Sequence, residues 1–188
     1  MYELIILSIL LGTPAHGYLI AKIVNNVLGP YAKVNSGRLY PLLAKLEEQG
    51  AIEAIEPDST QKESGRQTNA YRITAKGTQL FRRLMLDTSS NPGDYQKIFW
   101  LKAAMMDTLN PDERLFLIEH YINYCQSHVL YLKAKCEELK QGLSHNEIPQ
   151  HRYSIVHAIE HRAEHWQHEL EWGVSLKQQE LVEQKIGV

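Results

Sequence analysis

The sequence predicts a mainly α-helical chain, with a small α+β domain in its N-terminal half (the front) and a long-helix antiparallel coiled coil in its C-terminal half (the rear). Three observations support this. Apolar residues recur at helical spacing in three successive segments before residue 50. Two short strand patterns then flank a polar, turn-rich run between residues 51 and 74. Beyond residue 111, two long segments alternate apolar spacings of three and four. We expect a front domain over 1–87 and a rear domain over 94–188.

The composition allows a packed core. The chain has 188 residues, of which 44% are apolar, so general disorder is excluded. The formal charge is −2, yet residues 1–90 hold ten Lys and Arg against eight Asp and Glu, whereas residues 91–188 hold ten against fourteen. A weakly basic front and an acidic rear fit a DNA-contacting module joined to a partner-contacting one, although counts this small also arise by chance.

Cysteine use and the N-terminus predict a cytoplasmic protein. Cys125 and Cys136 are too far apart along one helix to bridge each other, and they form no metal motif. Two reduced, buried thiols are expected. The N-terminus lacks a basic flank and carries Glu3, so it does not resemble a signal peptide. No apolar run has the roughly 18–20 residues that a membrane span needs.

Three helices with short connections predict a helix-turn-helix core. The first, over 3–11, is apolar on nearly all sides and ends at Gly12-Thr13-Pro14. The second opens after Thr13 or His16 and ends at Gly29-Pro30. A short link leads to the third helix, over 35–50.

The third helix has the pattern of a recognition helix. Asn35 and Ser36 are its candidate N-caps, and Gly50 ends it. Pro41 predicts a bent or tight first turn. One face is apolar and can dock on a core, and it comprises Leu39, Leu42, Leu43 and Leu46. The other carries Arg38, Tyr40, Ala44 and Lys45. Arginine, tyrosine and a cap serine at a helix start can reach phosphates and base edges.

The residues after Gly50 predict a wing. Strand patterns over 51–56 and 69–74 flank a polar hairpin with Lys62 and Arg66 at its tip. Thr74 then caps a fourth helix. A solvated turn would show the same composition, but its place directly after a helix-turn-helix favours contact with DNA.

Three ordered motifs resemble the PadR family of bacterial transcriptional regulators. They are His16-Gly17-Tyr18, the run 36–43 (Ser-Gly-Arg-Leu-Tyr-Pro-Leu-Leu) continued by 46–50, and the run 71–77 (Tyr-Arg-Ile-Thr-Ala-Lys-Gly). The resemblance covers roughly residues 1–86. It implies a dimeric winged helix in which Ser36, Arg38 and Tyr40 face DNA and the hairpin touches the adjacent groove.

The rear half predicts a helical hairpin. After a linker at 87–94 and a helix over 95–108, Asn110, Pro111 and Glu113 form a helix-start signal. A long helix over 111–142 and a last helix over 150–185 carry apolar seams. These seams pair within one chain, across a dimer, or both. The arrangement is similar to the C-terminal part of phenolic-acid-responsive PadR proteins and their AphA relatives, which implies dimerisation by these helices.

An aromatic stripe with polar tips runs beside the first seam. It comprises Tyr121, Tyr124, His128 and Tyr131. These side chains either line a pocket for a planar ligand, joined by His16 and Trp100, or pack at an interface with their tips in water. The resemblance favours a phenolic acid as the ligand.

A histidine series occupies one face of the last helix. His157, His161 and His165 fall at i, i+4 and i+8, where neighbouring pairs could bind zinc, but the interspersed glutamates favour a solvated or ion-paired face. No nucleophile elbow, phosphate loop or metal-hydrolase motif appears. We expect no enzyme, no metal and no cofactor.

The sequence therefore predicts a dimeric, ligand-responsive repressor that binds a near-palindromic operator. Its expected DNA-contacting residues are Lys33, Asn35, Ser36, Arg38, Tyr40, Lys45, Lys62, Arg66 and Arg72. Arg38 is the best candidate for a guanine contact. Two other interpretations remain: a winged helix that docks protein and has lost DNA binding, and a metal-dependent enzyme that uses the rear histidines.

Overall fold

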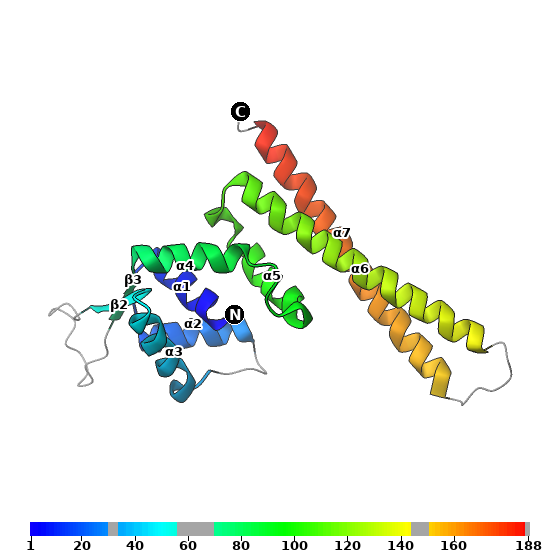
Figure 1. Cartoon of the computed structure of the whole chain (residues 1–188), viewed down its shortest axis with the longest axis horizontal. Helices are drawn as coiled ribbons and strands as arrows, with labels where there is room; N and C mark the ends of the chain where they lie inside the picture. The colour runs from blue at the N-terminus through cyan, green and yellow to red at the C-terminus, as the bar shows by residue number, and fades with distance from the viewer. Residues whose placement is uncertain (30–33, 56–69, 144–150, 187–188) are drawn as a thin grey trace. The chain divides into compact units, whose positions relative to one another are not determined.

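The computed structural model describes residues 1–29, 34–55, 70–143 and 151–186 (Figure 1). The chain divides into two compact units, Met1–Met105 and Met106–Val188. This division puts the segment Tyr95–Ala103 in the first unit, whereas the sequence-based boundary groups it with the rear helices.

The first unit is helical with a small antiparallel sheet, as expected. Its elements are α1 Tyr2–Gly12, β1 Ala15–His16, α2 Gly17–Leu28, α3 Ser36–Glu48, β2 Ile52–Ile55, β3 Ala70–Ile73, α4 Ala75–Leu86, η1 Pro92–Asp94 and α5 Tyr95–Ala103. The sheet order is β1-β3-β2. Strand β1 was not expected, because two residues are too few to show the alternation of a strand. Helix α5 also ends five residues before the expected end at 108.

Helix α1 forms the centre of the first unit's core. Its buried side chains are Leu4, Ile5, Ile6, Leu7 and Leu10. They lie on several sides of the helix, which packs against α2, α4 and β3. The expectation of a helix buried on most sides is confirmed, and burial of this apolar surface is the main source of the unit's stability.

Hydrogen bonds of Thr74 and a close contact at Gly77 fix the start of α4 to the residues that follow α3. Thr74 caps α4, its hydroxyl oxygen accepting from the Gly77 N–H at 3.0 Å. The same hydroxyl donates to the Gly50 carbonyl at 2.6 Å, and the Thr74 N–H donates to the Ala51 carbonyl at 3.0 Å. A Cβ on Gly77 would lie 2.0 Å from the Ala51 oxygen, so only glycine fits there.

A buried lysine joins α5 to the end of α4. Lys102 is 1% exposed, and its Nζ donates to the Asp87 carbonyl at 2.5 Å. Burial lowers the pKa of Lys102 to about 8, against a smaller opposing effect of the Asp87 carboxylate. That carboxylate accepts hydrogen bonds from Ser89 and Ser90, which lower its own pKa.

The second unit is a helical hairpin. It comprises η2 Met106–Thr108, α6 Pro111–Leu143 and α7 His151–Ile186. The two long helices run side by side in opposite directions (Figure 1). The predicted capping box is confirmed: the Glu113 N–H donates to the Asn110 side chain at 3.0 Å, and the Asn110 N–H donates to the Glu113 carboxylate at 3.2 Å.

The seams of α6 and α7 pack against each other within one chain. Ion pairs across the hairpin fix their register. The Arg114 guanidinium donates two hydrogen bonds to the Glu180 carboxylate, at 2.7 and 2.8 Å, in a bidentate ion pair. Lys177 lies 2.7 Å from Glu119, further along the same helices. At Gly173 the helices approach closely, since a Cβ there would lie 3.1 Å from the Cγ1 of an isoleucine on α6.

The expectation of two buried cysteines is confirmed. Cys125 and Cys136 are both buried and both free thiols. Within the described ranges, no helix combines the length and the apolar character that crossing a membrane would require.

Substitution of Gly77 tests the junction between α3 and α4. We expect Gly77→Ala to lower the free energy of unfolding by about 3 kcal/mol or more, because the new methyl group must displace the Ala51 carbonyl. Denaturant unfolding followed by circular dichroism measures this. The control is Gly12→Ala, since a Cβ on Gly12 meets nothing within 4 Å. Equal stabilities for the two variants would contradict the close approach.

Candidate nucleic-acid interface and a hollow on the rear hairpin

The first turn of α3 is capped and tight. The Asn35 side-chain oxygen accepts from the Arg38 N–H at 3.0 Å. The Asn35 backbone carbonyl accepts from both the Arg38 N–H at 3.1 Å and the Leu39 N–H at 3.0 Å. A bond that spans three residues is narrower than an α-helical turn. The tight turn expected before Pro41 is therefore present.

The two faces of α3 divide as predicted. Leu39, Leu43 and Leu46 are buried, and Leu42 is half-buried. The opposite face is exposed and carries Ser36, Arg38, Tyr40 and Lys45. An apolar side holds the helix on the core while a polar side is free to meet another molecule.

Two cations of this polar face have partners in the first turn of α1. The Arg38 guanidinium carbon lies 4.5 Å from the centre of the Tyr2 ring. The Lys45 Nζ lies 2.8 Å from a carboxylate oxygen of Glu3, and this hydrogen bond raises the pKa of Lys45. Sequence reasoning missed Tyr2 and Glu3, because residues so distant along the chain leave no local pattern.

Tyr40 packs at the junction of α2 and α3. It is 46% exposed. A Cβ on Gly17, the first residue of α2, would lie 3.3 Å from the Tyr40 ring and from its hydroxyl oxygen. One side of Tyr40 is thus set against the backbone of α2, which restricts the ring to a narrow range of positions.

The wing residue Arg72 is paired across the sheet. Its Nε lies 2.5 Å from a carboxylate oxygen of Glu53, the residue opposite it in the β2–β3 register. Both side chains are largely exposed, so the pair adds little to stability. The other predicted cations, Lys33, Lys62 and Arg66, lie outside the described residues.

Comparison with known families concerns this same segment. Residues 6–83 match the transcriptional regulator PadR-like family. The matched residues make up less than half of the chain and are similar to that family. All three motifs on which the sequence-based resemblance rests fall within the matched residues. The matched family is one of transcriptional regulators rather than enzymes.

Solved structures similar to this chain include three from bacteria. Bacillus subtilis PadR in complex with operator DNA is 20% identical, with 95% of this chain and 96% of that chain covered and a TM-score of 0.42. A transcriptional regulator from Clostridium thermocellum is 27% identical over 43% of this chain and 75% of its own, with a TM-score of 0.37. A Streptococcus mutans protein is 22% identical over 99% and 98%, with a TM-score of 0.38. No match was found among curated proteins.

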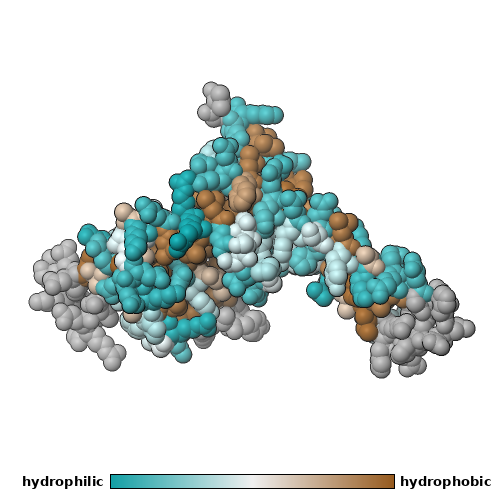
Figure 2. All heavy atoms as spheres, viewed as in Figure 1, coloured by the Kyte–Doolittle hydropathy of each residue, from teal (hydrophilic) through white to brown (hydrophobic). Residues whose placement is uncertain are grey.

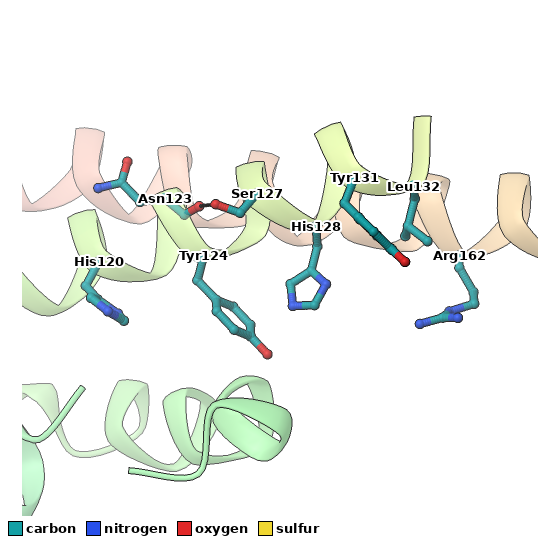
Figure 3. A pocket seen from close by; sticks show the side chains of 8 residues that line it. All are labelled: His120, Asn123, Tyr124, Ser127, His128, Tyr131, Leu132 and Arg162. Carbon is teal, nitrogen blue, oxygen red and sulfur yellow. Dashed lines mark hydrogen bonds between the residues drawn. The ribbon is translucent and has the colours of Figure 1, made fainter. Parts of the chain in front are cut away.

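On the rear hairpin, a hollow of about 520 Å³ opens beside α6. Its lining comprises His120, Asn123, Tyr124, Ser127, His128, Tyr131, Leu132 and Arg162. Figure 3 shows the Tyr124 and His128 rings and the Arg162 side chain pointing to the same side of the two helices. Three residues of the predicted aromatic stripe therefore share one surface.

Tyr121, the fourth member of the stripe, is buried inside the hairpin. It is fully buried, and its hydroxyl donates to the Glu169 carboxylate on α7. Burial is the main cause that raises the pKa of Tyr121, followed by this hydrogen bond. Tyr121 thus holds α6 to α7 rather than lining the hollow or meeting water.

The lining of the hollow includes Arg162, which sequence reasoning did not assign to it, and its His128 ring contacts Trp166 on α7. The His128 ring is stacked on the Trp166 ring with centroids 4.1 Å apart and planes 5° apart. Burial lowers the pKa of His128, and the nearby Arg162 charge lowers it further. Arg162 lies one helical turn before Trp166 on α7, and this spacing is the signal that could have placed it near His128.

The remaining predicted ligand residues belong to the other unit. His16 lies in β1, and Trp100 lies on α5 and is 44% exposed. Their part in a pocket shared with the rear hairpin stays a prediction. His157, His161 and His165 are exposed on α7. Across the described ranges, no group of three or more His, Cys, Asp or Glu side chains is placed to hold a metal ion.

Removal of the α3 cap has a defined stability cost. We expect Asn35→Ala to lower the free energy of unfolding by about 1 kcal/mol, because the Arg38 N–H loses its side-chain acceptor. Asn35→Ser keeps an oxygen that can accept this bond, so its free energy of unfolding should fall by only a few tenths of a kcal/mol. Thermal unfolding of both variants measures the difference. An unchanged stability of Asn35→Ala would show that the cap contributes nothing.

Proposed function

We propose that the protein is a dimeric, ligand-responsive transcriptional regulator, acting as a repressor at a near-palindromic DNA operator. The observation that carries this proposal is the exposed polar face of α3 within the PadR-like domain. An arginine and a tyrosine on the first turns of a capped helix have the reach and the donors for a major groove.

Arg38 is the residue we assign to base recognition. It is exposed, and its planar guanidinium can donate two parallel hydrogen bonds to a guanine edge. Ser36 and Asn35, at the helix start, are the residues we assign to phosphate contacts there. Lys45 and Arg72 already face carboxylates, so each adds less to phosphate binding than a solvated cation would. Lys33, Lys62 and Arg66 complete the proposed contacts on sequence grounds alone.

The rear hairpin is the proposed dimerisation element. Figure 2 shows hydrophobic residues exposed among hydrophilic ones on α6 and α7. Leu130 is 61% exposed and Val182 is 54% exposed, although the seams themselves are buried within the hairpin. A second copy could cover such residues, and we expect the resulting dimer to bind two half-sites about one DNA turn apart, roughly 34–36 Å.

The hollow beside α6 is the proposed effector site. Its rings offer stacking to a planar ligand, and Arg162 offers a positive charge to a carboxylate. A small phenolic acid combines both features. Such a ligand alters regulation if its affinity differs between DNA-bound and free arrangements of the dimer.

A protein-docking winged helix without DNA binding is the alternative. The net charge of −2 and the carboxylate partners of Lys45 and Arg72 favour it. A salt titration separates the two, because DNA binding through phosphates weakens steeply as salt rises.

Replacement of Arg38 tests the DNA contact. In a gel-shift assay we expect Arg38→Ala to reduce binding to the operator by about ten- to a hundredfold while leaving binding to unrelated DNA nearly unchanged. Arg83→Ala is the control, since it removes the same charge from an exposed position on α4. Unchanged sequence preference in Arg38→Ala would count against the proposed contact.

Replacement of Arg162 tests the effector site. We expect 4-hydroxycinnamic acid to quench tryptophan fluorescence, because the Trp166 ring stacks on His128, which lines the hollow. Arg162→Gln should weaken this binding by about tenfold, since a charge-assisted hydrogen bond is lost. The corresponding alcohol, which lacks the carboxylate, should bind both forms equally. If acid and alcohol bind alike to the unaltered protein, Arg162 has no such role.

A further inference from the structure

The first turn of α1 contacts two cations of the proposed DNA-facing surface in different ways. Tyr2 presents an aromatic face to Arg38, at 4.5 Å from guanidinium carbon to ring centre. Its neighbour Glu3 presents a carboxylate to Lys45, at 2.8 Å. One contact leaves the cation's charge intact, whereas the other offsets it. This difference has consequences for DNA binding.

The contact with Tyr2 restricts Arg38 without using its donors. A cation–π contact needs no hydrogen-bond acceptor, and where a guanidinium stacks on a ring its N–H groups lie in the plane and point outward. Those N–H groups are the ones that bind a guanine edge. Holding the side chain in one orientation reduces the conformational entropy lost on binding. Arg38 is therefore oriented and still able to bind.

The contact with Glu3 has the opposite effect on Lys45. The carboxylate forms a hydrogen-bonded ion pair with the ammonium, so the pair has no net charge. A phosphate that approaches Lys45 also approaches Glu3, which repels it. Phosphate contacts supply nearly all of the affinity in non-specific binding, which does not depend on the DNA sequence. Glu3 thus weakens binding that does not depend on sequence.

We infer that Tyr2 and Glu3 are positioning residues that raise the ratio of sequence-specific to non-specific DNA binding. Tyr2 orients the arginine that reads bases, and Glu3 restrains the lysine that meets phosphates. This inference rests on the proposed function, since it concerns how the same surface of α3 selects DNA. It adds two residues of α1 that make no proposed DNA contact themselves.

The test begins with the full-length protein and a randomised DNA pool. The sequence that the unaltered protein enriches is made as a 30-base-pair duplex, together with a shuffled duplex of the same composition. Affinities for both are measured by fluorescence anisotropy across a range of salt concentrations. If the unaltered protein enriches no sequence, the proposed function fails, and the inference fails with it.

Three variants of Tyr2 isolate the ring. Tyr2→Phe keeps an aromatic face and should retain the affinity for the enriched duplex. Tyr2→Leu keeps apolar bulk without a ring and should lose about two- to fivefold on that duplex, with little change on the shuffled one. Tyr2→Ala should lose at least as much as leucine. Thermal unfolding confirms that each variant is folded. If Tyr2→Leu keeps the specificity ratio of Tyr2→Phe, the role of Tyr2 is overturned.

Two matched charge changes isolate Glu3. Glu3→Gln releases Lys45, and the shuffled duplex should then bind several-fold more tightly, with a salt slope steeper by up to about 0.9. Glu48→Gln removes an equal charge from an exposed position on α3 outside the Glu3–Lys45 pair. A larger effect of Glu3→Gln supports the inference. Equal effects of the two variants would show that only net charge matters and would overturn the role of Glu3.

Discussion

A backbone contact that only glycine permits joins the start of α4 to the residues that follow α3. At Gly77 the start of α4 approaches the Ala51 carbonyl so closely that a methyl group would occupy the same space. Thr74 adds hydrogen bonds to the Gly50 and Ala51 carbonyls, at the point where α3 has ended and β2 begins. The end of α3, the sheet and α4 therefore share one anchoring point, and the polar face of α3 is held in place from there.

Short-range chemistry made much of the fold readable from the sequence. The caps at Asn35, Thr74 and Asn110 depend on residues three positions away. Thr74 and Asn110 were predicted as caps, and Asn35 was one of two candidates beside Ser36. The apolar stripe of α3 and the seams of the rear hairpin follow from helical periodicity. The fold class required no information beyond these local patterns.

Features that depend on distant residues were not predictable in the same way. Strand β1 exists because Ala15 and His16 pair with β3, more than fifty residues further on. Tyr2 and Glu3 meet α3 only once α1 is packed in the core. Tyr121 had the right spacing to join the aromatic stripe, yet its hydroxyl meets a buried carboxylate on α7. Spacing along one helix shows which residues share a face, but not what that face meets.

Burial of Lys102 on α5 controls how readily this one amine can be acylated. Amines attack acylating reagents only in their neutral form, and Lys102, with a pKa of about 8, holds more of that form at neutral pH than an ordinary lysine. Its side chain is nevertheless shut off from solvent. Acylation of Lys102 therefore requires the segment around the Asp87 carbonyl to open first, and its rate would follow that local opening rather than the intrinsic nucleophilicity of the amine.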